Sequence, residues 1–215
     1  YYGPIAGWDT SQVTDMSYLF DGKGSFNDDI SLWNVSKVTT MESMFRYAEA
    51  FNGDIRLWNV SKVTNMAYMF LVASAFNGDI RLWDVSKVTA MYYMFGFTSA
   101  FNGDISLWDV SKVTNMLAMF RNATAFNGDI SSWNVSAVTT MQWMFYNATA
   151  FSKDIRGWSV SASTVRTEMF TGATLMIQNY SAPPTPTPAT QWFIIDHVLV
   201  SNICFPAGTL IATNQ

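Results

Sequence analysis

The chain of 215 residues has one cysteine, Cys204, and one histidine, His197. A single cysteine excludes a disulfide within the chain, which suits a reducing compartment and equally a surface protein stabilised by other means. Only 13% of the residues are charged, the formal net charge is -4, and no cluster of Lys or Arg is present. Phosphate binding needs concentrated basic side chains, so we expect no nucleic-acid partner.

Long apolar runs are also missing. The longest, residues 192–205, is short and is interrupted by Asp196 and His197, so we expect no membrane span. The chain starts at Tyr1 with no signal peptide, which indicates a mature chain or a piece of a longer protein. The repeats contain no paired nucleophile and base, no phosphate-binding loop and no metal-ligand spacing, so we expect neither an enzyme nor a cofactor.

What the sequence has in abundance is repetition. Units of 25 residues follow one another without insertions, and "LWNVSKVTNM" in one unit reads "LWDVSKVTAM" in the next. With the Phe of "FNGDI" as position 1, seven units begin at residues 1, 26, 51, 76, 101, 126 and 151. Ile at position 5, Trp at 8, Ser at 11, Thr at 14 and Phe at 20 occur in all seven. A fixed period of this length predicts like units stacked side by side.

Within a unit the pattern changes from one half to the other. In residues 54–60, Trp58 and Leu57 fall on opposite sides, which predicts a short strand. In residues 63–73, apolar side chains recur at offsets of three and four, which predicts a helix. We therefore expect an α/β solenoid over residues 1–175, a right-handed coil of seven strand–turn–helix units. Its strands would form a parallel sheet along one face, about 4.8 Å apart.

The unit carries a family resemblance. "FNGDISLWDVSKVTNM", followed by "MF" and Ala in register, resembles the BspA-like leucine-rich repeats of surface proteins, which also occur in mycoplasma lipoproteins. The match covers about residues 1–175. It implies a leucine-rich-repeat-like solenoid at an extracellular or cell-surface location, linked to adhesion or host-protein binding, with no catalytic residues.

Aspartate recurs at position 4 of the unit. The column comprises Asp29, Asp54, Asp79, Asp104, Asp129 and Asp154. Because Asn-Gly-Asp stretches form Asx turns, we expect each carboxylate to accept amides of its own turn. The alternative is a Ca²⁺ site made by Asp54, Asp79, Asp104 and Asp129. It would need about six to eight oxygens for each ion, and the neighbouring asparagines supply few.

Position 9 alternates between Asn and Asp, which predicts side-chain hydrogen bonds to the backbone at the end of the strand. Several asparagines also lie in N-x-S/T sequons: Asn34, Asn59, Asn122, Asn134, Asn147 and Asn179. These are glycosylation sites if the protein passes through a eukaryotic secretory pathway. Because Ser at position 11 recurs for structural reasons, some of the sequons arise from the repeat itself.

Positions 17, 18, 21 and 22 should point outward from the second half of each unit, and they are unexpectedly apolar. The residues are Tyr68, Leu71, Val72, Tyr92, Tyr93, Phe97, Leu117, Trp143 and Tyr146. Exposed aromatic patches mark contact surfaces. This patch predicts binding to other copies of the chain, to surface proteins or to glycans. The alternative is that the helix is rotated or that another segment covers it.

The tail has a different composition. Residues 176–191 form a Pro/Thr-rich linker, and residues 192–203 predict a strand that lies back on the repeats or adds to a neighbouring molecule. Residues 204–215, "CFPAGTLIATNQ", resemble the start of a Hint (hedgehog/intein) domain. That resemblance implies Cys204 as the nucleophile and Ile203–Cys204 as the scissile bond. The rest of such a domain is absent, so we expect no self-processing by this chain.

Function is expected to reside in the scaffold. The sequence predicts a non-enzymatic protein at the extracellular or particle surface that acts through protein or glycan contacts, including a fibre subunit joined end to end. The alternatives are an adhesin-like or lectin-like module and a precursor released by Hint processing. In the seventh unit, Ser163 and Arg166 replace the usual Val and Met, which is typical of a capping coil.

Overall fold

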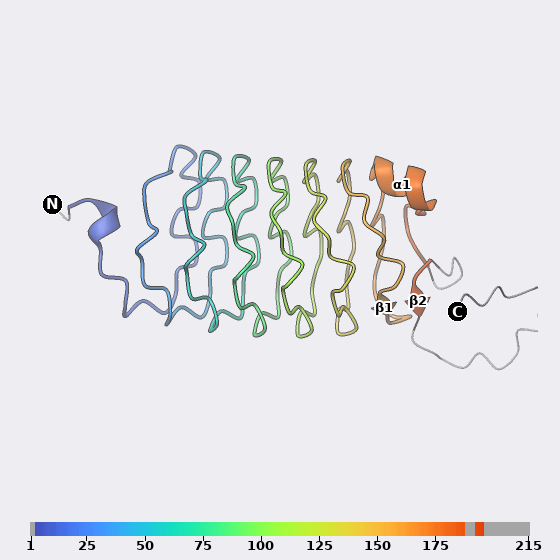
Figure 1. Ribbon diagram of the computed structural model, residues 1–215, viewed down its shortest axis with the longest axis horizontal. Coiled ribbons are helices and arrows are strands. Elements are labelled where there is room, and N and C mark those ends of the chain that lie inside the picture. The colour runs from blue at the N-terminus through green and yellow to red at the C-terminus, as the bar shows by residue number, and fades with distance from the viewer. Residues whose placement is uncertain (1–2, 188–191, 196–215) are drawn as a thin grey trace, which may run out of the picture.

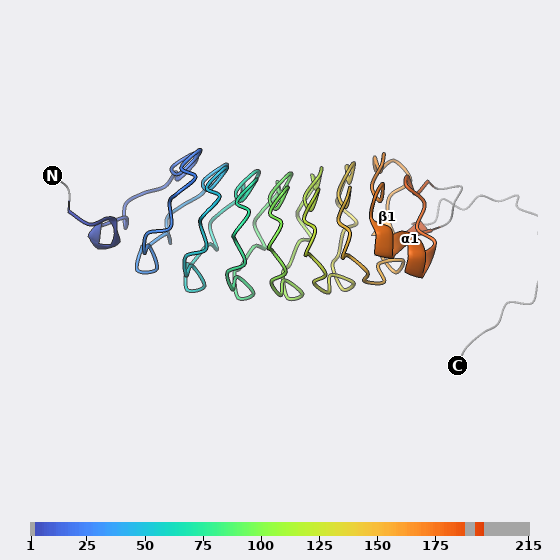
Figure 2. The same cartoon turned by 90° about the horizontal axis from the view of Figure 1, so that it is seen from above.

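The computed structural model describes residues 3–187 and 192–195. The chain forms an elongated stack in which each 25-residue unit makes one coil (Figure 1). The view from above shows the same order from the N-terminal to the C-terminal end (Figure 2). We number the coils one to seven, starting at residues 1, 26, 51, 76, 101, 126 and 151. Equivalent positions of successive coils are therefore neighbours in space, as the period predicts.

Regular secondary structure is sparse in the described residues. It consists of the 3-10 helix η1 (Ile5–Gly7), strand β1 (Ser159–Val160), helix α1 (Thr174–Tyr180) and strand β2 (Ile194–Ile195). Between coils one and seven, position 15 of each coil forms one isolated parallel bridge with position 15 of the next. The stack of repetitive units is confirmed, whereas the predicted continuous parallel sheet is not.

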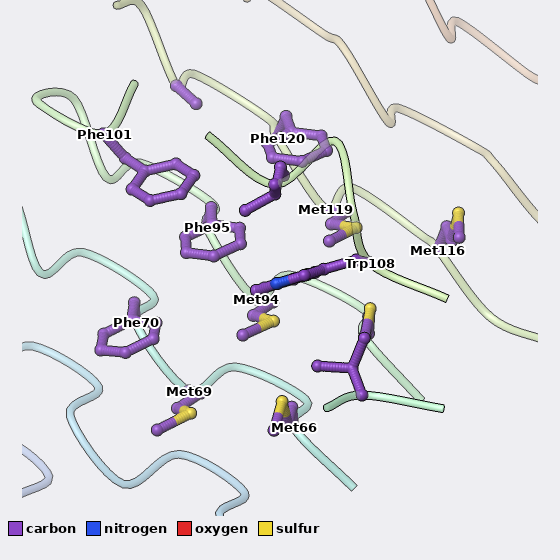
Figure 3. Close-up of a cluster of buried hydrophobic side chains, with 14 of the residues drawn as sticks. Met66, Met69, Phe70, Met94, Phe95, Phe101, Trp108, Met116, Met119 and Phe120 are labelled. Atoms are coloured by element: carbon purple, nitrogen blue, oxygen red, sulfur yellow. The ribbon is translucent and has the colours of Figure 1, made fainter. Parts of the chain in front are cut away.

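The interior consists of files of identical side chains. The Phe rings at position 20 lie parallel in a file, and the centroids of Phe70 and Phe95 are 5.7 Å apart with 7° between the ring planes. A second file of Phe rings, at position 1, packs beside the first; the ring centroid of Phe101 in this file lies 4.0 Å from that of Phe95 in the first. The methionines Met94 and Met119 lie beside these rings, next to Trp108 (Figure 3). One unit has too few neighbours to bury these groups, so burial depends on stacking.

The tryptophans at position 8 bind the preceding coil. The indole N–H of Trp108 donates to the carbonyl of Ile80 at 3.1 Å, and Trp83 makes the equivalent bond to Ile55 at 3.1 Å. Every indole from coil two to coil seven repeats this contact. The repeated Trp therefore buries its ring and adds a hydrogen bond between coils, to a carbonyl that also accepts an amide within its own coil.

The helix predicted for the second half of each unit is wrong; that segment forms consecutive turns. In coil three the amide of Met69 bonds to the carbonyl of Met66, three residues earlier, and Leu71 bonds likewise to Tyr68. The alternate amides leave the coil: Tyr68 donates to Tyr92 of coil four at 2.9 Å. An α-helix needs these amides for its own bonds to residue i−4, so the two arrangements exclude each other.

Backbone torsions explain why the turns keep a helix-like spacing of apolar residues. Positions 18 and 22 have positive φ, for example 57° at Tyr68 and 61° at Val72. These left-handed residues interrupt any helix after a single turn. They still return Met66, Met69 and Phe70 to the interior, where all three are fully buried.

The first half of each unit also lacks the predicted strand within the described residues, apart from β1 in coil seven. The predicted alternation of side chains is nevertheless present. Trp58 is buried and Leu57 is exposed. Positions 6 and 7 form a turn, which is closed by a hydrogen bond from the Trp amide at position 8 to the Ile carbonyl at position 5. In coil three this bond joins Trp58 to Ile55 at 3.2 Å.

Coil seven is covered by the residues that follow it. The carbonyl of Pro184 accepts the amide of Phe170 at 3.0 Å, in the place where a further coil would bond. β2 pairs in parallel with β1, and Phe193 stacks on Trp158 with centroids 6.3 Å apart. The described part of the Pro/Thr-rich segment thus lies against the stack. The rest of the strand predicted over 192–203 lies outside the described residues.

Candidate binding surfaces

The residues predicted to form an outer patch lie on the turn-rich side of coils three to six. We call positions 17, 18, 21 and 22 of these coils the outer face. Eight of the nine predicted residues are half-buried, and Phe97 is 38% exposed. The structure gathers the aromatic members into two groups, which we describe in turn.

The first group, the tyrosine cluster, is Tyr68, Tyr92 and Tyr93. Tyr68 stacks on Tyr93 with centroids 5.4 Å apart and meets the edge of Tyr92 at 4.9 Å. Burial raises the pKa of the Tyr68 and Tyr92 hydroxyls, so both stay protonated and can donate hydrogen bonds at neutral pH. Leu71 lies beside it, 3.0 Å from the point that a Cβ on Gly96 would occupy.

The second group, the arginine cluster, contains a residue that the sequence did not single out. The Cζ of Arg121 lies 5.0 Å from the ring centroid of Trp143, 4.9 Å from Tyr146 and 5.8 Å from Phe97. Trp143 is held in turn by Glu168, which accepts its indole N–H at 3.2 Å. Charge and aromatic rings from coils four, five and six therefore meet at one place. A sequence signal existed, since position 21 carries Arg in only two units.

The other arginine at position 21 is Arg46. Its Cζ lies 5.7 Å from the rings of both Tyr18 and Tyr47. Its Nε and Nη2 donate to the two carboxylate oxygens of Asp21 at 2.8 and 2.6 Å. These bonds to the guanidinium hold the pKa of the Asp21 carboxyl below its usual range.

The aspartate column forms the predicted Asx turns. Asp104 accepts the amide of Ser106 at 2.9 Å, and this bond lowers the pKa of its carboxyl. Asp79 instead receives the amide of Arg81 at 3.2 Å, with the guanidinium Nε 3.6 Å from its second oxygen. In residues 3–187 and 192–195, no group of three or more acidic, His or Cys side chains is placed to hold a metal ion.

Position 9 makes the predicted side-chain bonds to the backbone. Asn134 accepts the amide of Ser136 at 3.2 Å and its hydroxyl at 2.7 Å. Among the sequon asparagines, Asn34, Asn59, Asn134 and Asn179 are exposed, whereas Asn122 and Asn147 are half-buried on the outer side of coils five and six. Asn122 and Asn147 also have positive φ, of 56° and 54°.

A second exposed surface was not identified from the sequence as a site. We call it the leucine row; it consists of Leu32, Leu57, Leu82 and Leu107, which are 84, 79, 72 and 74% exposed. Arginines with paired aspartates flank its middle, as in Arg56 and Asp54, whose Nε and Oδ2 are 3.4 Å apart. The strand-like alternation predicted the outward direction of Leu57, and its recurrence at position 7 in coils two to five was the available signal.

The Hint-like segment falls outside the described residues, as do Cys204, the Ile203–Cys204 bond and His197. The prediction for that segment therefore stands as made. Within the described part of the chain, no helix has the length and apolarity to cross a bilayer.

Comparison with known proteins locates the repeats in a family. The family model described as "Mycoplasma protein of unknown function, DUF285" matches residues 2–102 and again residues 77–182. No curated protein and no solved structure matches the chain. The two matched ranges overlap and together span every coil and the start of the cap, so the chain is a tandem-repeat protein that belongs to the DUF285 family of Mycoplasma proteins.

Proposed function

We propose that this chain is a non-catalytic scaffold at an extracellular or particle surface that binds carbohydrate or protein through its outer face. The carrying observation is the division of labour within each coil. From coil two onward the aromatic side chains that are the same in every unit, such as Trp108 and Phe120, are buried, whereas the outer face differs from coil to coil and carries the tyrosine and arginine clusters. The surface location rests on the resemblance of the repeats to those of surface proteins.

The same division supports a leucine-rich-repeat-like solenoid. Each coil bonds to the next through parallel bridges and alternate amides on one side, as leucine-rich repeats do through their strands. Varied side chains on a regular frame make an extended surface that can bind a ligand over several coils.

Glycan-array binding and adhesion to intact cells test this proposal. We expect a signal from the native protein and its loss in a Tyr93→Ala, Trp143→Ala double variant. Ile177→Ser, at an exposed side chain of helix α1, is the matched control and should keep the signal. A binding role for the outer face would be refuted if the native protein bound neither the glycan array nor the cells. It would also be refuted if the double variant bound as well as the control.

A second candidate is self-association through the leucine row. Four leucines exposed in line are costly in water, and burial of each would contribute about 1.5–3 kcal/mol. A two-fold axis between coils three and four would bring the row of one copy onto the row of another, with Arg56 and Arg81 meeting aspartates of the second copy. The prolines of the cap cannot donate to a further coil, which favours this arrangement over end-to-end addition at coil seven.

Sedimentation velocity at increasing concentration tests the second candidate. Dimers should form in the native protein and disappear in a Leu57→Ser, Leu82→Ser variant. A native protein that remains monomeric at millimolar concentration would exclude it.

A further inference from the structure

We propose that the arginine cluster is a binding site for an acidic sugar, in which Arg121 takes the carboxylate and the surrounding rings take the sugar ring. This inference rests on the proposed function and names the ligand class of one part of the outer face.

The first observation is the geometry of the cluster. The guanidinium carbon lies within 5.0 Å of the Trp143 centroid and 4.9 Å of the Tyr146 centroid, with the exposed ring of Phe97 at 5.8 Å. Cation–π attraction holds Arg121 between the rings. A charged fork is thus fixed beside flat apolar surfaces instead of extending freely into water.

The second observation is that the fork has no partner within the described part of the chain. No carboxylate or carbonyl there accepts a hydrogen bond from the Arg121 side chain, and its Nε is buried without an acceptor. Because only the Nε is buried, the Nη groups remain accessible, and an incoming carboxylate can accept hydrogen bonds from them.

The third observation comes from the same coil position three units earlier. Arg46 also lies against aromatic rings, but its fork is closed by the carboxylate of Asp21, at position 21 of the preceding coil. The residue that precedes Arg121 by one coil is Gly96, which has no side chain to offer. The Asp21–Arg46 pair shows which group this arrangement accepts, and at Arg121 the chain does not supply it.

The aromatic rings favour an acidic sugar over an acidic peptide as the ligand that brings the carboxylate. A pyranose has a flat face of C–H groups that packs on an aromatic ring, while its hydroxyls stay in water; a short acidic peptide has no such face. The Glu168 carboxylate at the indole N–H of Trp143 disfavours a second negative charge nearby. The site therefore suits an oligosaccharide with a single uronic acid better than a polyanion.

Calorimetric titration with three probes tests this assignment. The probes are xylotetraose, a xylan oligosaccharide of the same length that ends in one glucuronic acid, and a peptide whose single charged side chain is one glutamate. The acidic sugar should bind at least about tenfold more tightly than either of the others, since a charge-assisted bidentate contact and ring stacking are both required.

Two variants and one control locate the contact. Arg121→Gln should weaken acidic-sugar binding by about tenfold, to the level of the neutral sugar. Gly96→Asp supplies an internal carboxylate and should have the same effect, after the side chains of Leu71 and Tyr93 move from the 3.0 and 3.1 Å contacts that the new Cβ would make. Arg156→Gln removes the same charge from an exposed arginine of coil seven and should leave the affinity unchanged.

The acidic sugar binding no better than the neutral one, the peptide binding equally well, or Arg121→Gln binding like the native protein would each overturn the inference. If cells or arrays still retain the native protein in those cases, the outer face binds a different ligand and the proposed function stands. If the outer-face double variant also loses nothing, the proposed function fails as well.

Discussion

The two ends of the stack present the same side chains in opposite surroundings. At the N-terminal end Trp8 is 45% exposed and borders a hollow of about 630 Å³ together with Ile5, Leu19 and Phe20. At the C-terminal end Trp158 is 1% exposed, beneath Phe193 and the cap. The indole occupies position 8 in both coils, so its burial comes from a neighbour and not from its own unit.

The polar groups of the two ends differ in the same way. Among the described residues, no backbone amide donates to the carbonyls of Ser17 and Leu19 in coil one, whose equivalents in later coils accept amides of the preceding coil. In coil seven, Pro184 and Thr185 accept the amides of Phe170 and Glu168. Arg166 adds three bonds, to the carbonyls of Pro186, Ser161 and Ala162. A cap therefore has to replace both the apolar surface and the hydrogen bonds of a missing coil.

The largest effect should come from removing the indole where both neighbours are present. Trp108→Ala should lower the free energy of unfolding by about 3–5 kcal/mol, because it leaves a cavity and removes the indole hydrogen bond to the Ile80 carbonyl. Trp8→Ala should cost about 1 kcal/mol, since nearly half of that side chain is already in water. Equilibrium unfolding in urea measures both. Equal losses would contradict the dependence on neighbours.

A smaller effect is expected from opening the cap. Arg166 is 6% exposed, and burial lowers the pKa of its guanidinium. The guanidinium donates to the three carbonyls named above. Arg166→Met restores the residue usual at position 16 and should cost about 1–3 kcal/mol, because the carbonyls of Pro186 and Ala162 lose the guanidinium as donor.

Thermal unfolding and hydrogen exchange at the Phe170 amide report this loss of the cap. The matched control is Arg156→Met, which breaks the exposed pair with Asp154 and the contact with the Tyr180 ring, and it should cost less than about 1 kcal/mol. A Phe170 amide that exchanges no faster in Arg166→Met would show that the cap holds without the arginine.

The smallest effect is the response to acid. The first coil has three carboxyls with lowered pKa values: Asp9 bonds to the Ser11 amide, Asp15 to the Ser17 amide and Asp21 to Arg46. In coil seven, Asp154 is the described carboxyl with a lowered pKa. A lowered pKa stabilises the fold at pH values above the ordinary 3.8, and this contribution disappears as the pH falls through the lowered value.

Acid should therefore loosen the N-terminal end before the C-terminal end. Hydrogen-exchange protection at pH 6 and pH 3, corrected for intrinsic rates, measures the order. Asp21→Asn should lower the protection of coil one already at pH 6, so that less of it remains to be lost at pH 3. Coil seven losing its protection first would contradict the assignment.

Much of the architecture followed from the sequence because each coil has the same neighbours. Identities at positions 8 and 20 predicted files of Trp and Phe, and the alternation around Trp58 predicted which side chains point inward. The decay at Arg166 predicted a capping coil. These conclusions need only the period and the apolar pattern, both of which are local in sequence.

The errors arose where hydrogen bonds between coils decide the outcome. Offsets of three and four at Met66, Met69 and Phe70 suit a helix and also a series of turns, and only the bond from Tyr68 to Tyr92 separates them. The arginine cluster was missed for a related reason. Phe97, Arg121 and Trp143 come from three coils, and their contact depends on the lateral offset between coils, which no single unit encodes.

An experimental density map at side-chain resolution tests the central claim most directly. We predict that the position-20 rings from Phe45 to Phe170 lie in one file with neighbouring centroids 5.6–5.7 Å apart, and that each indole from Trp33 to Trp158 reaches the Ile carbonyl of the coil before it. A map in which successive units turn these rings toward different neighbours would contradict the account.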